Sequence, residues 1–245
     1  MSQVARVYPG EKDRLKKLVY VWQFPVRVFH WVTALCITVL FLTGLYIAFP
    51  VLTTPGEPWN QFLMARVRQI HFFAAYLWLV AYLLRSAWFF LGNKYARSGM
   101  PQPWSPRWWR EFFVELFSYA FVRRQRSTRL GHNALAGVAY TIFPIGLGFA
   151  QILTGFALYS ETDPSGWADR LTGWVIPLLG GSFRAHMWHH LFAWGFLWFV
   201  IVHVYIVVFD SIRDRNSLVE SMITGYKSLE IDATAVGKRD QESGR

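Results

Sequence analysis

The chain has 245 residues, of which 53% are hydrophobic and 18% aromatic, and its formal net charge is +10. This composition is too apolar for an ordinary soluble domain and favours a helical membrane protein. The basic residues flank apolar runs, where they set orientation and meet anionic lipid headgroups, so the charge does not indicate nucleic-acid binding. The single cysteine, Cys36, excludes an intrachain disulfide, a cysteine-ligated iron–sulfur cluster and a covalent C-x-x-C-H haem.

Four apolar runs each approach the roughly twenty residues that a helix needs to cross a bilayer. We expect these membrane spans at residues 28–49, 70–91, 134–159 and 187–209. The first run is too long for the apolar core of a signal peptide and has no clear A-x-A cleavage site, so we expect it to stay as an anchor. The sequence therefore predicts an all-α integral membrane four-helix bundle in one domain, residues 1–230, with a disordered cytoplasmic tail at 231–245.

The distribution of Lys and Arg predicts the orientation of the bundle. The N-terminal segment and the long loop between the second and third spans are rich in basic residues, whereas the other two connections are less so. By the positive-inside rule the long loop and both chain ends face the cytoplasm. Within this loop, Trp beside Arg at 104–110 and apolar residues at helical spacing over 111–122 are typical of a helix in the headgroup layer.

Histidines within or beside the spans indicate a functional site, because ionisable side chains at membrane depth are costly. In the fourth span, His189 and His203 lie fourteen residues apart, which on a helix is about 40° around the axis and about 21 Å along it. His30 and His71 begin the first and second spans. Since successive spans cross in opposite directions, His71 and His189 share an outer layer, and His30 and His203 share an inner layer.

Two histidine pairs at matching depths suit two bis-histidine haems, which must be of b type because the sequence has no covalent attachment motif. Ordinary helix-end histidines, held by local hydrogen bonds or reaching to the interface, are the alternative. The sequence offers no acid–base pair or nucleophile, so we expect electron and proton transfer, with no catalytic residue.

The same interval of fourteen residues selects further candidates. From His30 it leads to Gly44, and Gly155 on the third span is comparable; at both positions a missing side chain would let a porphyrin approach, although ordinary close helix packing explains such glycines too. From His71 it leads to Arg85 at the inner layer, where the guanidinium would either bind haem propionates or snorkel to the interface.

Three further histidines have less definite roles. His186 is a candidate for binding a propionate or a partner protein at the outer surface. His132 is either an interfacial polar residue or part of a quinone or proton site, and His190 points away from the ligand face.

An ordered set of motifs covers nearly the whole chain: Pro25–Trp31, Arg68–His71, Gly92–Ser98, Gly131–Asn133, Leu153–Ser160, His186–His190, His203–Tyr205 and Met222–Tyr226. Together they resemble the b-type cytochrome subunit of membrane-bound nickel–iron hydrogenases. The resemblance implies a di-haem subunit of the bacterial inner membrane that anchors a periplasmic hydrogenase. It also implies that electrons pass from the nickel–iron large subunit through the iron–sulfur small subunit to this chain. The chain would then reduce quinone. The family's axial ligands fall on His30, His71, His189 and His203.

Other readings remain open from the sequence alone. Similar di-haem cytochromes serve formate dehydrogenases and thiosulfate reductases, although residues 92–95 and 153–159 resemble the hydrogenase branch. A membrane zinc protein is a rival of another class, but the sequence has no H-E-x-x-H motif and its imidazoles fall in two separate layers. A purely structural anchor would have no need of two aligned histidine layers.

Overall fold

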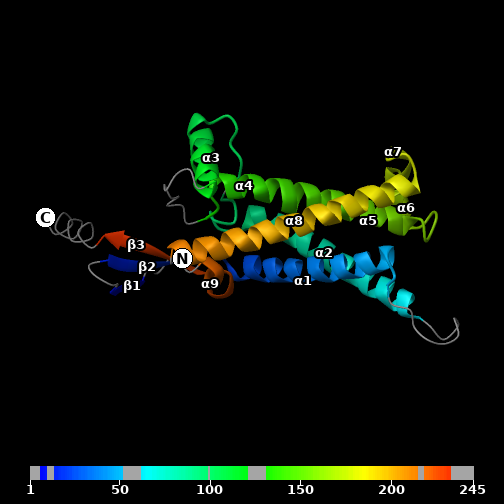
Figure 1. Cartoon of the computed structure of the whole chain (residues 1–245), viewed down its shortest axis with the longest axis horizontal. Helices are drawn as coiled ribbons and strands as arrows, with labels where there is room; N and C mark the ends of the chain where they lie inside the picture. The colour runs from blue at the N-terminus through cyan, green and yellow to red at the C-terminus, as the bar shows by residue number, and fades with distance from the viewer. Residues whose placement is uncertain are drawn as a thin grey trace.

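Four long helical rods form the body of the protein (Figure 1). The computed structural model describes residues 6–9, 14–51, 62–98, 100–120, 131–214 and 218–232. The rods are α1 (Phe24–Ala48), α2 (Leu63–Leu91), a third rod formed by α4 (Ala134–Tyr140), η2 (Thr141–Leu147) and α5 (Gly148–Ser160), and α8 (Ser182–Asp214). All four are long and apolar enough to cross a membrane. The predicted all-α membrane bundle is therefore confirmed.

Three of the rods begin earlier than the apolar pattern predicts, at Phe24, Leu63 and Ser182. The apolar run measures the width of the bilayer core, whereas a helix continues into the headgroup region as long as its backbone hydrogen bonds can be made. In α1 a proline occupies the first turn, where its missing N–H costs nothing.

The third rod contains a π-helical segment, η2, with Pro144 inside it. Proline has no N–H and clashes with the carbonyl one turn earlier, so the chain accommodates it by widening the helix. The Tyr82 hydroxyl of α2 donates a hydrogen bond to the Ile145 carbonyl oxygen at 3.0 Å. The widened segment thus gains a side-chain partner on α2 immediately before α5 begins.

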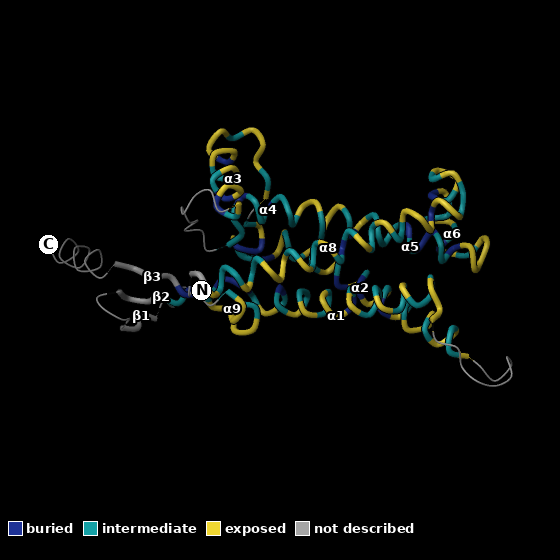
Figure 2. Tube along the Cα trace, viewed as in Figure 1, coloured by how far each residue is buried: buried dark blue, intermediate teal, exposed yellow. Residues whose placement is uncertain are grey.

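Most of the length of the rods is exposed or of intermediate burial (Figure 2), and many of the exposed residues are large and hydrophobic. Phe73 and Phe90, for example, are 71% and 75% exposed, as expected for helices whose surroundings are lipid. The central core contains Cys36, Trp78 and Phe196 from α1, α2 and α8, and the last two rings meet edge to face at 5.5 Å. This core lies about halfway along each of the three helices.

A small antiparallel sheet joins the two ends of the chain. Its order is β1 (Arg6–Pro9), β2 (Arg14–Tyr20) and β3 (Tyr226–Asp232). We call this side of the bundle the sheet end, and the opposite side, which carries α6 (Trp167–Thr172) and α7 (Val175–Leu178), the loop end (Figure 1). The expected disordered tail, 231–245, lies outside the described residues apart from the last two residues of β3.

Helix α3 (Pro106–Tyr119), from the long loop, projects sideways at the sheet end (Figure 1). Its Glu115 accepts a hydrogen bond from the Asn133 side chain at 3.1 Å, and its Tyr119 hydroxyl donates to Asp210 at 2.5 Å. Burial, assisted by this carboxylate, raises the pKa of Tyr119 well above its usual range. These bonds attach α3 to the third rod and to α8, while α9 (Leu218–Thr224) leads from α8 to β3.

One hydrogen-bond network connects the start of α1 to the end of α2. The Gln23 side-chain oxygen accepts from the Asn93 N–H at 2.8 Å and from Trp88 Nε1 at 3.2 Å. Asn93 in turn donates from Nδ2 to the Val21 carbonyl at 3.2 Å, and its Oδ1 caps the following turn by accepting from the backbone N–H of Ala96 at 3.0 Å. Asn93 therefore fixes the sheet end of the first two rods.

We expect Asn93→Ala to lower the thermal midpoint of the detergent-solubilised protein. The substitution removes the side-chain partner of the Val21 carbonyl and of the Tyr95 N–H, which donates to Asn93 Oδ1 at 3.1 Å, and a lost buried hydrogen bond costs about 1–3 kcal/mol. The measurement is thermal unfolding followed by intrinsic Trp fluorescence, with the exposed Gln102→Ala as the control variant. Equal midpoints for the two variants would contradict this role.

Candidate functional site

The structure brings His30 of α1 and His203 of α8 together at the sheet end. Their ring centroids are 6.4 Å apart, with the ring planes inclined at 52°. With metal–nitrogen bonds of about 2 Å, two imidazoles on opposite sides of one metal have ring centres about 6 Å apart. The His30 Nδ1 atom is buried and has no hydrogen-bond partner within the described part of the chain. The spacing of this sheet-end pair therefore fits a single metal atom.

At the loop end, His71 of α2 lies against two adjacent residues of α1. A Cβ atom added to Gly44 would come within 3.3 Å of His71 Cε1, so the glycine makes room for the imidazole ring. The neighbouring Thr43 places its Oγ1 2.8 Å from His71 Nδ1. α1 thus holds the ring from two sides.

The third rod provides a matching arrangement for His189 of α8. A Cβ atom on Gly155 would lie 3.0 Å from His189 Cε1, and Thr154 Oγ1 lies 3.0 Å from His189 Nδ1. The side-chain amide of Gln151 is 3.2 Å from His189 Nε2. His189 is also close enough to His71 for the two imidazoles to interact electrostatically. We call His71 and His189 the loop-end pair.

A basic and aromatic cluster adjoins the sheet-end pair. Arg85 donates from Nη2 to the Ala96 carbonyl at 3.2 Å, and its guanidinium lies 5.4 Å from the centre of the Tyr140 ring. Its Nη1 is buried and has no hydrogen-bond partner among the described residues. Arg85 therefore has a buried N–H donor still available for an anion.

His132 belongs to the same cluster. Its ring lies 5.1 Å from the Trp22 ring and 5.6 Å from that of Tyr140, and its backbone N–H donates to Ser98 Oγ at 3.1 Å. Burial, together with the Arg85 guanidinium, lowers the pKa of His132 to about 4. His132 is therefore a neutral imidazole at physiological pH and can be a hydrogen-bond donor and acceptor beside Arg85.

The remaining candidate histidines lie near the start of α8. His186 is exposed, and its Nδ1 is 3.0 Å from the Ser182 carbonyl one turn earlier. His190 is half-buried beside His189. The described residues hold no group of three or more His, Cys, Asp or Glu side chains that could bind a metal ion. The ring contact between His30 and His203 involves two imidazoles, which differs from the four-ligand shell typical of structural zinc.

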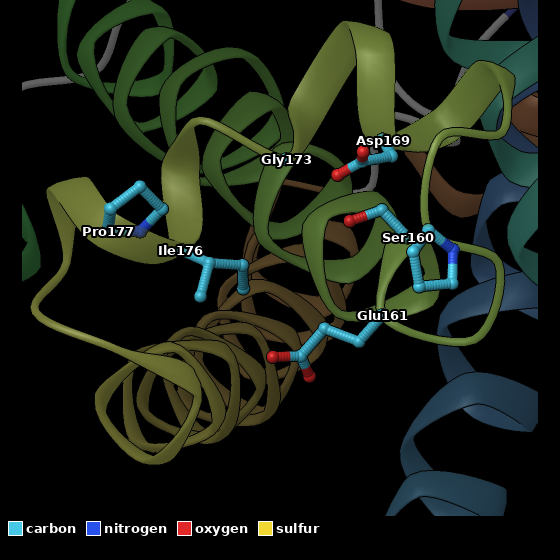
Figure 3. Close-up of a pocket in the computed structure, with 7 residues that line it drawn as sticks. Ser160, Glu161, Asp169, Gly173, Ile176 and Pro177 are labelled. Atoms are coloured by element: carbon cyan, nitrogen blue, oxygen red, sulfur yellow. The ribbon is translucent and has the colours of Figure 1, made fainter.

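The loop end also has an open hollow between the end of α5 and the short helices α6 and α7 (Figure 3). Its acidic lining residues are Glu161 and Asp169. Both carboxylates are engaged, because Glu161 accepts from the Ser182 hydroxyl at 2.9 Å and Asp169 accepts from the Ser165 N–H at 3.1 Å. Both acidic side chains of the hollow therefore already have hydrogen-bond donors at the surface of the loop end.

Sequence reasoning selected the glycines but missed Thr43, Thr154 and Gln151. A signal for the threonines was present, because Leu-Thr-Gly occurs at both 42–44 and 153–155. Gln151 lies one helical turn before Gly155, so helical spacing from the glycine would have found it.

Known proteins are similar over most of the chain. A family model described as prokaryotic cytochrome b561 matches residues 21–225. An Azotobacter vinelandii protein described as "Probable Ni/Fe-hydrogenase B-type cytochrome subunit" is 42% identical over 225 residues, covering 91% of this chain and 93% of the relative. A Cupriavidus necator protein of the same description is 44% identical over 216 residues, with 87% and 88% covered. The Escherichia coli K12 "Probable Ni/Fe-hydrogenase 1 B-type cytochrome subunit" is 35% identical over 216 residues, with 85% and 90% covered.

We expect Gly155→Ala to disturb the loop-end pair more than Gly44→Ala. The added methyl group would lie 3.0 Å from the His189 ring in the first variant and 3.3 Å from the His71 ring in the second, so the imidazole must move by a few tenths of an ångström, and further in the first variant than in the second. The measurement is the amount of haem b per purified chain, since the sequence predicts a haem at this pair. Gly146→Ala is the control, because its Cβ would meet only the Thr141 carbonyl at 3.4 Å; equal haem content in all three variants would contradict the expectation.

Proposed function

This chain belongs to the prokaryotic cytochrome b561 family, and we propose that it is the membrane anchor and electron-transfer subunit of a respiratory nickel–iron hydrogenase. In this role it accepts electrons from the iron–sulfur small subunit, which receives them from the nickel–iron large subunit, and delivers them to quinone in the bacterial inner membrane. The observation that carries the proposal is the pair of facing imidazoles, His30 and His203, 6.4 Å apart inside an apolar bundle. The descriptions of the relatives favour hydrogenase as the partner.

The residues present fit two b haems. His30 and His203 would hold one at the sheet end, and His71 and His189 would hold the other at the loop end. A b haem bound by two imidazoles supplies a one-electron Fe(III)/Fe(II) couple. Arg85, with its buried and unpartnered Nη1, would bind a propionate of the sheet-end haem.

The chain's other residues provide a water-excluding environment between the two sites. Trp78, Phe196 and Cys36 fill the middle of the bundle. Their packing holds the four rods at fixed distances and excludes water from the region between the pairs.

Charge supports an orientation with the sheet end in the cytoplasm. Basic residues are concentrated near that end, and Arg27 donates a hydrogen bond to the Ile223 carbonyl there. At the loop end, Glu161, Asp163 and Asp169 offset most of the charge of Arg66, Arg68, Arg170 and Arg184. By the positive-inside rule the loop end then faces the periplasm, where the small subunit would dock, and quinone would be reduced near the sheet end beside Arg85 and His132.

We expect His71→Ala and His203→Ala each to remove one b haem, because each substitution deletes one ligand of a different pair. The measurement is a reduced-minus-oxidised spectrum with haem stoichiometry on the purified chain. His190→Ala, which alters the neighbour of a proposed ligand, should keep both haems. If both haems persist in both ligand variants, the ligand assignment is wrong.

The function itself is tested in membranes that contain the whole complex. Hydrogen should reduce the b haems of the wild type, and added quinone should reoxidise them. In a strain that lacks this chain, hydrogen should still reduce a soluble dye, but it should not reduce quinone. Reduction of the haems by formate and not by hydrogen would instead assign the chain to a formate dehydrogenase.

A further inference from the structure

The two loop-end histidines share an arrangement that the sheet-end pair does not show. Thr43 lies 2.8 Å from His71 Nδ1 and Thr154 lies 3.0 Å from His189 Nδ1. Both threonines occur in Leu-Thr-Gly segments of helices that run towards the loop end. Two different rods therefore supply the same hydroxyl contact to two different imidazoles.

Both threonine hydroxyls have carbonyl acceptors within their own helices. A threonine hydroxyl has one proton to donate. Thr43 Oγ1 donates it to the Val39 carbonyl at 2.6 Å, and Thr154 Oγ1 donates it to the Ala150 carbonyl at 2.8 Å. With its proton directed at these carbonyls, each Oγ1 has a lone pair that can accept from the imidazole, and in the arrangement inferred here Nδ1 carries the hydrogen in both histidines. The lone pair of each ring is consequently on Nε2.

The contact to Gln151 agrees with this tautomer. Its amide nitrogen lies 3.2 Å from His189 Nε2, and an NH2 group can only donate, so Nε2 must accept. The Gln151 side-chain oxygen is buried without a hydrogen-bond partner among the described residues. The amide therefore occupies the Nε2 lone pair that a metal would take in its place.

The sheet-end pair differs at the corresponding atom. His30 Nδ1 is buried and has no partner within the described residues. A hydrogen bond from the distal N–H of a metal-bound imidazole makes the ring a stronger electron donor, which favours the more oxidised metal. Such bonds to both ligands of one haem, and not to His30 of the other, would separate the two reduction potentials.

We propose that Thr43 and Thr154 are positioning residues that fix Nδ1–H in His71 and His189, direct both Nε2 atoms at one iron, and hold the loop-end haem at the lower reduction potential. This inference rests on the two-haem arrangement of the proposed function. Its consequence is directional: an electron that enters at the loop end moves to a site of higher potential at the sheet end. The difference between the two reduction potentials then depends on two hydroxyl groups that are not iron ligands and do not titrate.

The test is a potentiometric titration of haem b absorbance in the purified complex, with wild type, Thr43→Val, Thr154→Val, Thr43→Ser and Thr154→Ser. The Val variants keep the side-chain shape and remove the hydroxyl, whereas the Ser variants keep it. The loop-end haem is identified as the one lost in His71→Ala. Thr38→Val is the matched control on α1, because its hydroxyl donates only to the Ala34 carbonyl at 2.9 Å.

In each Val variant the midpoint of the loop-end haem should rise, with the Fe(III)/Fe(II) equilibrium shifted towards Fe(II) by about three- to tenfold, where tenfold is about 59 mV for one electron. The sheet-end midpoint, the Ser variants and Thr38→Val should match the wild type. Loss of the loop-end haem in a Val variant but not in its Ser counterpart would also support the positioning role.

Unchanged midpoints in both Val variants with both haems retained would overturn the proposal, as would an equal shift of both haems. Loss of the haem from the Ser variants would overturn it too, because the hydroxyl alone would then be insufficient. A wild type with one haem that His71→Ala leaves intact would refute the proposed function itself, and the threonine role with it.

Discussion

Satisfying histidine inside an apolar bundle is the constraint on which the rest of the structure depends. A neutral imidazole has one N–H that must be bonded and one lone pair that must be used, and the bilayer offers no water for either. At the loop end, threonine oxygens take the N–H groups of His71 and His189. Each threonine hydroxyl donates its own proton to a backbone carbonyl of the same helix. In the inferred arrangement each ring keeps one lone pair, on Nε2, and at His189 the Gln151 amide lies 3.2 Å from it.

The bundle meets this constraint by using its rods in two pairs. α1 contacts His71 of α2, and α5 contacts His189 of α8. In each case a threonine Oγ1 lies beside Nδ1 and a glycine lies against the imidazole ring. The close approach of Gly44 and Gly155 sets the distance between the paired helices, since a methyl group at either position would touch the imidazole. The spacing of the paired rods therefore depends on the contact between glycine and imidazole.

Parts of this arrangement could be predicted from the sequence because they follow from local rules. Bilayer thickness and helical repeat predict the four spans and the shared face of His189 and His203. The strand pairing of Arg14 with Asp232 could not be predicted in this way, because it joins segments from opposite ends of the chain. The threonine contacts were missed for a similar reason. Thr43 by itself resembles other threonines inside helices, because its partner His71 lies on another helix, α2. The helix starts were missed because hydropathy reports the lipid core and not the length of the helix.

The two proposed haem sites differ in the side chains that surround the histidines, and both differences favour one direction of electron flow. At the sheet end, Arg85 presents a buried positive charge beside a neutral His132. A nearby cation favours the reduced form of a redox centre, although a bound propionate would offset part of the effect. At the loop end, the hydroxyl acceptors of Thr43 and Thr154 favour the oxidised form. In the proposed arrangement the guanidinium raises one potential and the hydroxyls lower the other, so the direction of electron flow follows from side chains that are not themselves ligands.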